Sequence, residues 1–167
     1  MNVIKEGNAM ARLQKLNIPK AIDPRVRGRL SAEEIDAILE LSFLAIVADG
    51  RLSEPEMGAF SDALVALADP HQIQSLMNRL ANTSIHQQED VCFGVDSSRL
   101  RTLAGKLRSQ AAREQAYKLA YAMAMSDVHS GDCEFRYDQD LRKALGLTDE
   151  AAEQLIDQVV DIVGSPT

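Results

Sequence analysis

The 167-residue sequence predicts an all-α fold, a compact bundle of about seven helices in two pseudo-repeated halves. Aromatic residues make up only 4% of the chain and Trp is absent, a composition that suits helix packing better than strands. Apolar residues recur at helical spacing between successive capping signals. An apolar segment that runs into an acidic turn, residues 41–56, returns in weaker form at residues 119–134. These features indicate two related helical halves, each organised around one such segment.

The first helices can be placed from their caps. Residues 1–30 are basic and hold two prolines, which predicts an N-terminal arm or a short helix followed by an extended connector. Ser31 and Glu34 then form a capping box that starts a helix over residues 32–48. From Leu41 onward nearly every position of this helix is apolar, so we expect its second half to be buried on all sides.

Similar signals continue to the end of the first half. Gly50 can adopt the left-handed conformation that ends a helix, and Ser53 opens a second capping box for a helix over residues 54–68. Asp69 before Pro70 marks the start of a short helix through residue 80. Residues 82–96 are predicted to be a connector.

The second half repeats the plan with four helices. Gly146 should end the third of them and Thr148 should cap the fourth. We expect residues 41–48 and 119–125 to be the most buried segments and to pack on each other about a pseudo-two-fold axis. The predicted ranges are 97–109, 110–126, 132–145 and 149–163.

The net charge of −7 is distributed unevenly. Residues 1–30 hold seven Lys or Arg against two acidic residues, a net charge of +5, which leaves −12 on the remainder. Nucleic acid is therefore not expected as a partner, because phosphate binding needs a clustered basic surface and this arm lacks aromatic residues to stack on bases. We expect the arm to be a solvated tail or a segment lying on the acidic body.

The sequence also predicts a soluble, cytoplasmic protein. The N-terminus lacks the apolar core of a secretory signal. The longest apolar run, residues 43–48, is far below the ~18 residues that cross a bilayer, so no direct membrane insertion is expected. Cys92 and Cys133 fit no zinc-binding spacing and are expected to be free thiols in a reducing compartment.

The string D-G-R-L-S-E-P-E at residues 49–56 coincides with the second part of an EF-hand calcium loop. In that register the first and third ligand positions are Ala45 and Val47, whose apolar side chains cannot bind a hard cation. This is not an EF-hand.

Two interpretations of the acidic turn remain. Asp49 can accept hydrogen bonds from the following backbone amides in an Asx-turn, which is a purely structural role. Alternatively, Asp49 and Glu56, with Glu54 or Asp62 nearby, can share a divalent cation through their oxygens and through water. Asp127 and Glu134 have the same seven-residue spacing in the second half as Asp49 and Glu56 in the first, which makes these two pairs the candidate metal ligands.

Catalysis is not expected. The chain contains no nucleophile elbow, P-loop, zinc-protease helix or dinucleotide-binding glycine motif. His129 lies beside an acidic cluster that could hold a transition metal, but an unspecialised turn histidine is the commoner case. Cys133 is close to His129, yet acidic surroundings raise a thiol pKa rather than activate it.

The apolar helix that ends A-D-G-R-L-S-E-P-E, its degenerate second copy and the closing string A-L-G-L-T-D-E-A-A-E-Q-L-I carry a family resemblance. Residues 31–163 resemble the TerB family of tellurite-resistance proteins and the related N-terminal domain of some membrane-anchored DnaJ-type co-chaperones. The first motif matches at Ala48, Asp49, Gly50, Ser53 and Glu56, whereas the second has Val128 in place of the glycine.

This resemblance implies a compact helical module with two acidic metal sites, at Asp49 with Glu56 and at Asp127 with Glu134. It implies a role in bacterial tellurite and stress response without catalysis. The alternative is a protein-interaction scaffold or co-chaperone-type module whose acidic turns are only structural. Other proteins are the expected partners, with a homodimer as one option, and the identity of the ion is open.

Overall fold

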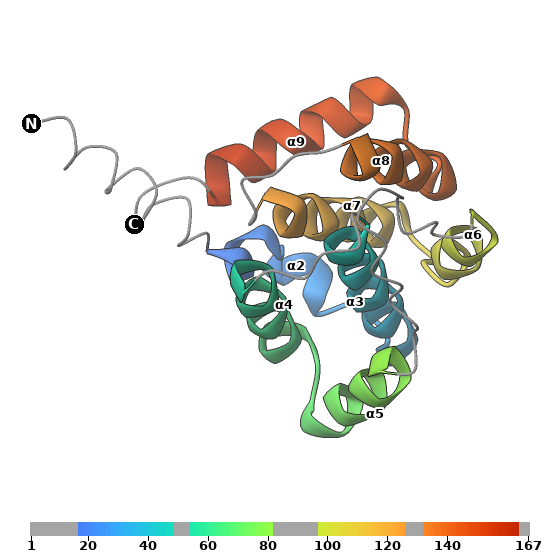
Figure 1. Ribbon diagram of the computed structural model, residues 1–167. Coiled ribbons are helices and arrows are strands. Elements are labelled where there is room, and N and C mark those ends of the chain that lie inside the picture. Colours follow the sequence, from blue (N-terminus) through green and yellow to red (C-terminus); the bar gives the residue numbers. More distant parts are fainter. Residues whose placement is uncertain (1–16, 49–53, 82–96, 126–131, 164–167) are drawn as a thin grey trace, which may run out of the picture.

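The computed structural model describes residues 17–48, 54–81, 97–125 and 132–163, and within these ranges the protein is all-α (Figure 1). This confirms the predicted fold class, while the pseudo-two-fold relation of the halves stays a prediction. In the described ranges two short helices come first, followed by seven longer helices, one for each of the seven predicted. The elements are η1 (Ile18–Ala21), α2 (Pro24–Arg27), α3 (Ala32–Val47), α4 (Glu54–Leu67), α5 (Pro70–Ala81), α6 (Ser97–Gly105), α7 (Gln110–Met125), α8 (Asp132–Leu145) and α9 (Asp149–Val163).

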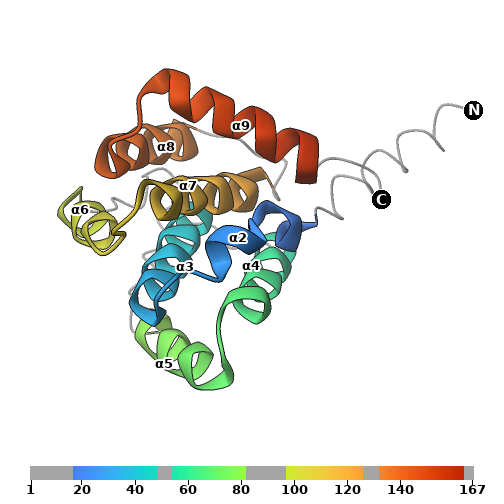
Figure 2. The same ribbon diagram turned by 180° about the vertical axis from the view of Figure 1, so that it is seen from behind.

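Helices α3 and α7 form the centre of the bundle and pack directly on each other, with α9 lying across α7 on the far side (Figures 1 and 2). Every residue from 37 to 48 is buried, and for residues 41–48 this confirms the prediction from the all-round apolar pattern. Most of residues 119–125 are buried as well. Three fully buried alanines at four-residue spacing, Ala112, Ala116 and Ala120, give α7 a face of small side chains that allows close helix packing.

Several predicted helix ends are confirmed by their hydrogen bonds. The Ser31 hydroxyl accepts from the Glu34 amide, and the Glu34 carboxylate accepts from the Ser31 amide, each at 3.2 Å. Asp69 accepts from the Gln72 amide at 2.8 Å at the start of α5. At the other boundary, Gly146 has φ +70° and ends α8. Thr148 accepts from the Ala151 amide at 3.1 Å, while Gly50 and Ser53 lie outside the described residues.

Helix α6 ends four residues earlier than predicted. The hydroxyl of Ser109 accepts from the Ala112 amide at 3.1 Å and so caps α7, which prevents this residue from ending α6. The amides of Lys106 and Leu107 bond three residues back, a tightening typical of a last helical turn.

The N-terminal segment differs from the extended connector that its prolines suggested. Pro19 and Pro24 each lie at the beginning of a turn, where the missing amide hydrogen has no helical acceptor in any case. They therefore start η1 and α2. Ile18, Ala21 and Ile22 are buried in the core, so residues of the basic segment belong to the packed domain.

A buried glutamine holds this segment in place. The Gln115 side chain on α7 accepts from the Asp23 amide and donates to the Ala21 carbonyl, both at 2.8 Å. A single side-chain amide thus satisfies two backbone groups that lie more than ninety residues away in the sequence. This contact helps to hold η1 against α4, α7 and α9.

The expectation of free thiols is wrong for Cys133, which is disulfide-bonded. The other cysteine of the sequence, Cys92, lies outside the described residues. Spacing along the chain could not show this, because pairing depends on whether two Cα atoms come within roughly 7 Å in space. Disulfides persist mainly in oxidising compartments, so the thiol argument for a cytoplasmic location is lost and the location stays a prediction. In the described part of the chain, no helix combines the length and apolar character needed to cross a bilayer.

Candidate functional site

In the sequence, two of the four predicted metal ligands follow α3 and α7, and the other two belong to the helices that come next, α4 and α8. Asp49 and Asp127 lie outside the described residues. Glu134 belongs to α8, but its side chain is likewise outside the described part. Only the Glu56 side chain can therefore be placed, and whether the pairs meet stays a prediction.

Glu56 lies in the first turn of α4 and is only 1% exposed. An ionised carboxylate is strongly disfavoured in a protein interior unless it is hydrogen-bonded, paired or bound to a metal. Glu56 does take part in a polar interaction. The positive end of the α4 dipole also favours a negative charge at this position. The fold thus holds a buried carboxylate in the first turn of α4, close in the sequence to residues 49–53.

Chemically, this carboxylate is a hard oxygen ligand of the kind that Ca²⁺, Mg²⁺ and Mn²⁺ prefer. The described residues contain no group of three or more His, Cys, Asp or Glu side chains placed to hold a metal ion. A centre that includes Glu56 would therefore need further ligands from outside those residues, and Asp49 is the predicted one. His71 is exposed on α5, while His86 and His129 lie outside the described ranges.

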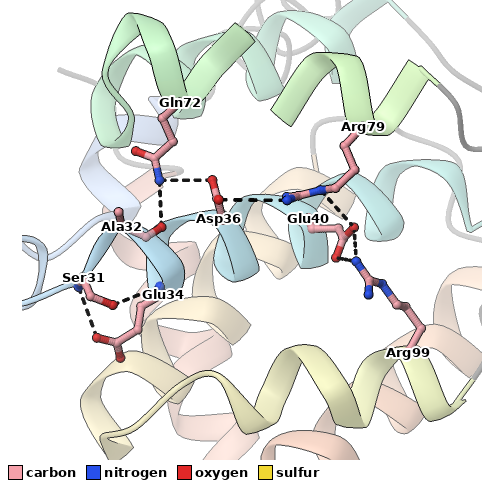
Figure 3. Close-up of polar contacts among 8 residues, drawn as sticks. All are labelled: Ser31, Ala32, Glu34, Asp36, Glu40, Gln72, Arg79 and Arg99. Atoms are coloured by element: carbon pink, nitrogen blue, oxygen red, sulfur yellow. Dashed lines mark hydrogen bonds and ion pairs between the residues drawn. The ribbon is translucent and has the colours of Figure 1, made fainter. Parts of the chain in front are cut away.

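Two acidic side chains, Asp36 and Glu40, form a row along α3 (Figure 3). This row was not predicted from the sequence. Buried Glu40 accepts from one terminal nitrogen of Arg99 at 2.6 Å through each oxygen, and Arg79 lies 3.8 Å away. Asp36 accepts from Gln72 at 3.0 Å and lies 4.0 Å from Arg79. Helices α5 and α6 are therefore both tied to α3 through this row. The available signal was Glu40 itself, a charged residue inside an apolar helical run.

A second charged cluster joins α7, α8 and α9 around buried Arg142. Its Nε lies 2.9 Å from the Asp138 carboxylate and donates to the Tyr117 hydroxyl at 3.1 Å, and that hydroxyl donates to Asp138 at 2.6 Å. The guanidinium also lies 5.8 Å from the centre of the Tyr117 ring. Asp149 and Glu153 lie at 3.4 and 3.5 Å from its terminal nitrogens.

Both clusters are closed networks. In the described part of the chain, no buried side-chain nitrogen or oxygen lacks a hydrogen-bond partner. Burial alone would lower the pKa of Arg142, but its bond to Tyr117 and the nearby carboxylates outweigh this and raise the pKa, so the guanidinium stays charged. Groups that are paired in this way hold helices together, and we assign them a structural role.

The buried tyrosines make the fold sensitive to alkali. The Tyr137 hydroxyl donates to the Leu41 carbonyl at 2.6 Å, and burial, followed by the charge of Glu40, raises its pKa well above the ordinary value of 10.0. Below about pH 10, the ordinary pKa, the hydroxyl keeps its proton in both the folded and the unfolded state. Above it, the unfolded chain ionises while the folded chain does not, so stability should fall by about 1.4 kcal/mol per pH unit for this group.

Urea unfolding between about pH 9 and about pH 11 tests this, with Tyr137→Phe as the comparison. The variant loses a hydrogen bond and is less stable near neutral pH, but its stability should fall less steeply above pH 10. Burial and Asp138 also raise the pKa of Tyr117, so part of the slope should remain. Identical slopes in the two proteins would contradict the assignment to Tyr137.

Comparison with known proteins identifies no relative: no family model, no curated protein and no solved structure matches this chain. The interpretation of the acidic turn therefore depends on the chemistry of this chain and on the resemblance of residues 31–163.

Proposed function

We propose that the protein is a non-catalytic, TerB-like helical module that binds a divalent metal ion at the acidic turn between α3 and α4. The observation that carries this proposal is the buried carboxylate of Glu56, held in the first turn of α4 directly after that turn. The role in bacterial tellurite or stress response is taken from the family resemblance.

The turn supplies the chemistry that such a site needs. Asp49 follows the last buried residues of α3, where a negative charge opposes the helix dipole unless a cation compensates for it. Glu56 is favoured by the opposite dipole end and is shielded from water, which strengthens its attraction for a cation. Two carboxylates with backbone carbonyls and water form an oxygen-rich set for a hard divalent ion. Asp127 and Glu134 would form a weaker second site, because Val128 replaces the glycine of the first turn.

Thermal unfolding with and without about 1 mM Ca²⁺, Mg²⁺, Mn²⁺ or Zn²⁺ tests the site. A cation that binds only the folded state stabilises it by RT ln(1 + [L]/Kd), about 2.7 kcal/mol at one hundred times Kd. Asp49→Asn should remove most of this gain, because it keeps the side-chain oxygen but loses the charge. Without cation, the stability of this variant should hold or rise slightly, since the unfavourable dipole interaction is relieved.

The matched control is Glu33→Gln, which neutralises an exposed carboxylate in the first turn of α3, at the opposite end of that helix from the acidic turn, and should leave the cation effect intact. Asp127→Asn should give a smaller loss than Asp49→Asn. Equal cation-induced shifts in the wild type and all three variants would exclude metal binding at these carboxylates.

A protein-interaction scaffold is the second candidate, favoured by large apolar side chains that the fold leaves exposed. Val65 on α4 and Phe135 on α8 are the most exposed of these. Under this alternative the acidic turns are Asx-type structures, and added cation changes the melting temperature of neither the wild type nor the variants. Another protein or a second copy of the chain would then be the partner.

A further inference from the structure

The side of α9 that faces away from the core is strongly acidic. Its buried residues, Ala152, Leu155 and Val159, lie on one face of the helix. Exposed carboxylates recur at three- and four-residue spacing on the opposite face. We call this set the acidic stripe of α9, and it consists of Glu150, Glu153, Asp157 and Asp161.

Two large apolar side chains flank the stripe at the C-terminal end of α9. Val160 is 44% exposed and Ile162 is 42% exposed. They lie on either side of Asp157 and Asp161 around the helix, since successive residues are about 100° apart. The C-terminal half of the outer face therefore combines two carboxylates with two uncovered apolar groups.

The described chain begins beside this surface. Asn17 precedes η1, and η1 packs against α9. In both views the C-terminal end of α9, drawn in red, lies next to η1, the blue segment at which the coloured ribbon begins (Figures 1 and 2). Sixteen residues precede Asn17, a length of roughly 24 Å even if fully helical, whereas α9 spans about 22 Å. The N-terminal residues can therefore reach any point on the acidic stripe.

The composition of these residues complements the outer face of α9. Residues 10–16 read M-A-R-L-Q-K-L, with apolar side chains at every third position and two basic residues, Arg12 and Lys15, between them. The apolar residues are Met10, Leu13 and Leu16. A segment that carries both apolar and basic side chains is complementary to a surface on which carboxylates are flanked by apolar groups.

Helix α4 also contacts η1, but it offers a poorer match. Its exposed positions include two carboxylates, Glu54 and Asp62, and one large apolar residue, Val65. The C-terminal half of the outer face of α9 has the same number of carboxylates but twice as many exposed large apolar side chains.

We propose that residues 10–16 dock on the C-terminal half of the outer face of α9. In this arrangement Arg12 and Lys15 pair with Asp157 and Asp161, and the apolar residues cover Val160 and Ile162. The segment would then act as an internal competitor for the acidic stripe, which a basic partner could reach only after the segment is displaced.

Trypsin cleavage of the folded full-length chain, followed by mass spectrometry, tests the proposal. Cleavage after Arg12 and Lys15 should be slow, whereas cleavage after Lys5, outside the docked residues, should be fast and serves as an internal reference. The double variant Asp157→Asn/Asp161→Asn should be cleaved after Arg12 and Lys15 about tenfold faster, because proteolysis follows the population of the undocked state. Val160→Ser/Ile162→Ser should have the same effect.

The matched control is Glu54→Gln/Asp62→Asn, which removes the same charge from α4 and should leave cleavage unchanged. A swap then tests direct pairing: Arg12→Glu should speed cleavage after Lys15, and adding Asp157→Lys should slow it again. All replaced α9 and α4 side chains are exposed, so unchanged circular dichroism will confirm that the variants fold.

Equal cleavage after Lys5, Arg12 and Lys15 in the wild type would overturn the proposal. It would equally be overturned if the α4 variant, rather than the α9 variants, accelerated cleavage. Protection that disappears on dilution would show that the segment docks on a second copy of the chain, which would also refute the intramolecular contact.

Discussion

Replacing Phe60 by alanine is expected to lower the free energy of unfolding by about 3–5 kcal/mol. Phe60 is 1% exposed on α4, and its ring packs against that of Phe43 on α3, with centroids 5.6 Å apart and planes inclined at 54°. The substitution removes this contact and leaves a cavity that a bundle of surrounding helices can close only in part. The loss is large for a domain whose total stability is about 5–15 kcal/mol.

Urea unfolding measures this effect, and Val65→Ala is the matched control on the same helix. Val65 is 76% exposed, so its truncation should change the stability by less than about 0.5 kcal/mol. The dependence of stability on urea concentration should stay the same in both variants, because neither changes the surface exposed on unfolding by much. If Phe60→Ala were as mild as the control, the packing of α4 on α3 would be wrong.

Replacing Arg142 by methionine is expected to destabilise the protein by roughly 2–4 kcal/mol. Methionine keeps most of the apolar stem but removes the guanidinium, which pairs with the Asp138 carboxylate and donates a hydrogen bond to the Tyr117 hydroxyl. The Asp138 side chain is then left without its ion-pair partner. It is 21% exposed, so water can solvate it in part, and the loss stays below the cost of stranding a fully buried charge.

A double-mutant cycle with Asp138→Asn separates the ion pair from the loss of packing. Since the two side chains are in contact, the second substitution should cost much less in the Arg142→Met background than in the wild type. Lys143→Ala, on the next and exposed position of α8, is the control and should be nearly neutral. Additive effects of the two cluster substitutions would show that the Arg142–Asp138 contact contributes little to holding α7, α8 and α9 together.

The acidic turn illustrates how far the sequence reaches toward a function. Its carboxylates, its glycine and their spacing are visible in residues 49–56, and these alone suggest a cation site. The burial of Glu56 is a property of the folded protein, because it depends on what packs around the first turn of α4. Without that burial, Glu56 would be one of many helix-start glutamates with no special affinity for a cation.

The sequence by itself determined the helices and most of their boundaries, because the signals for these are local. A capping hydroxyl at Ser31 or Thr148 acts on an amide three residues away, and the left-handed glycine at position 146 ends α8 through its own backbone. The apolar run of α3 likewise predicted its own burial, since a helix that is apolar on every side is stable only inside a core.

The tertiary structure alone decided how these helices are joined, because the partners lie far apart in the sequence. Glu40 meets Arg99 across 59 positions, and Gln115 meets the Ala21 carbonyl across 94. The same reason explains the role of Pro19 and the disulfide bond of Cys133. A proline can end one element or begin another, and a cysteine can stay free or pair, and in each case the choice depends on which distant groups the fold brings into contact.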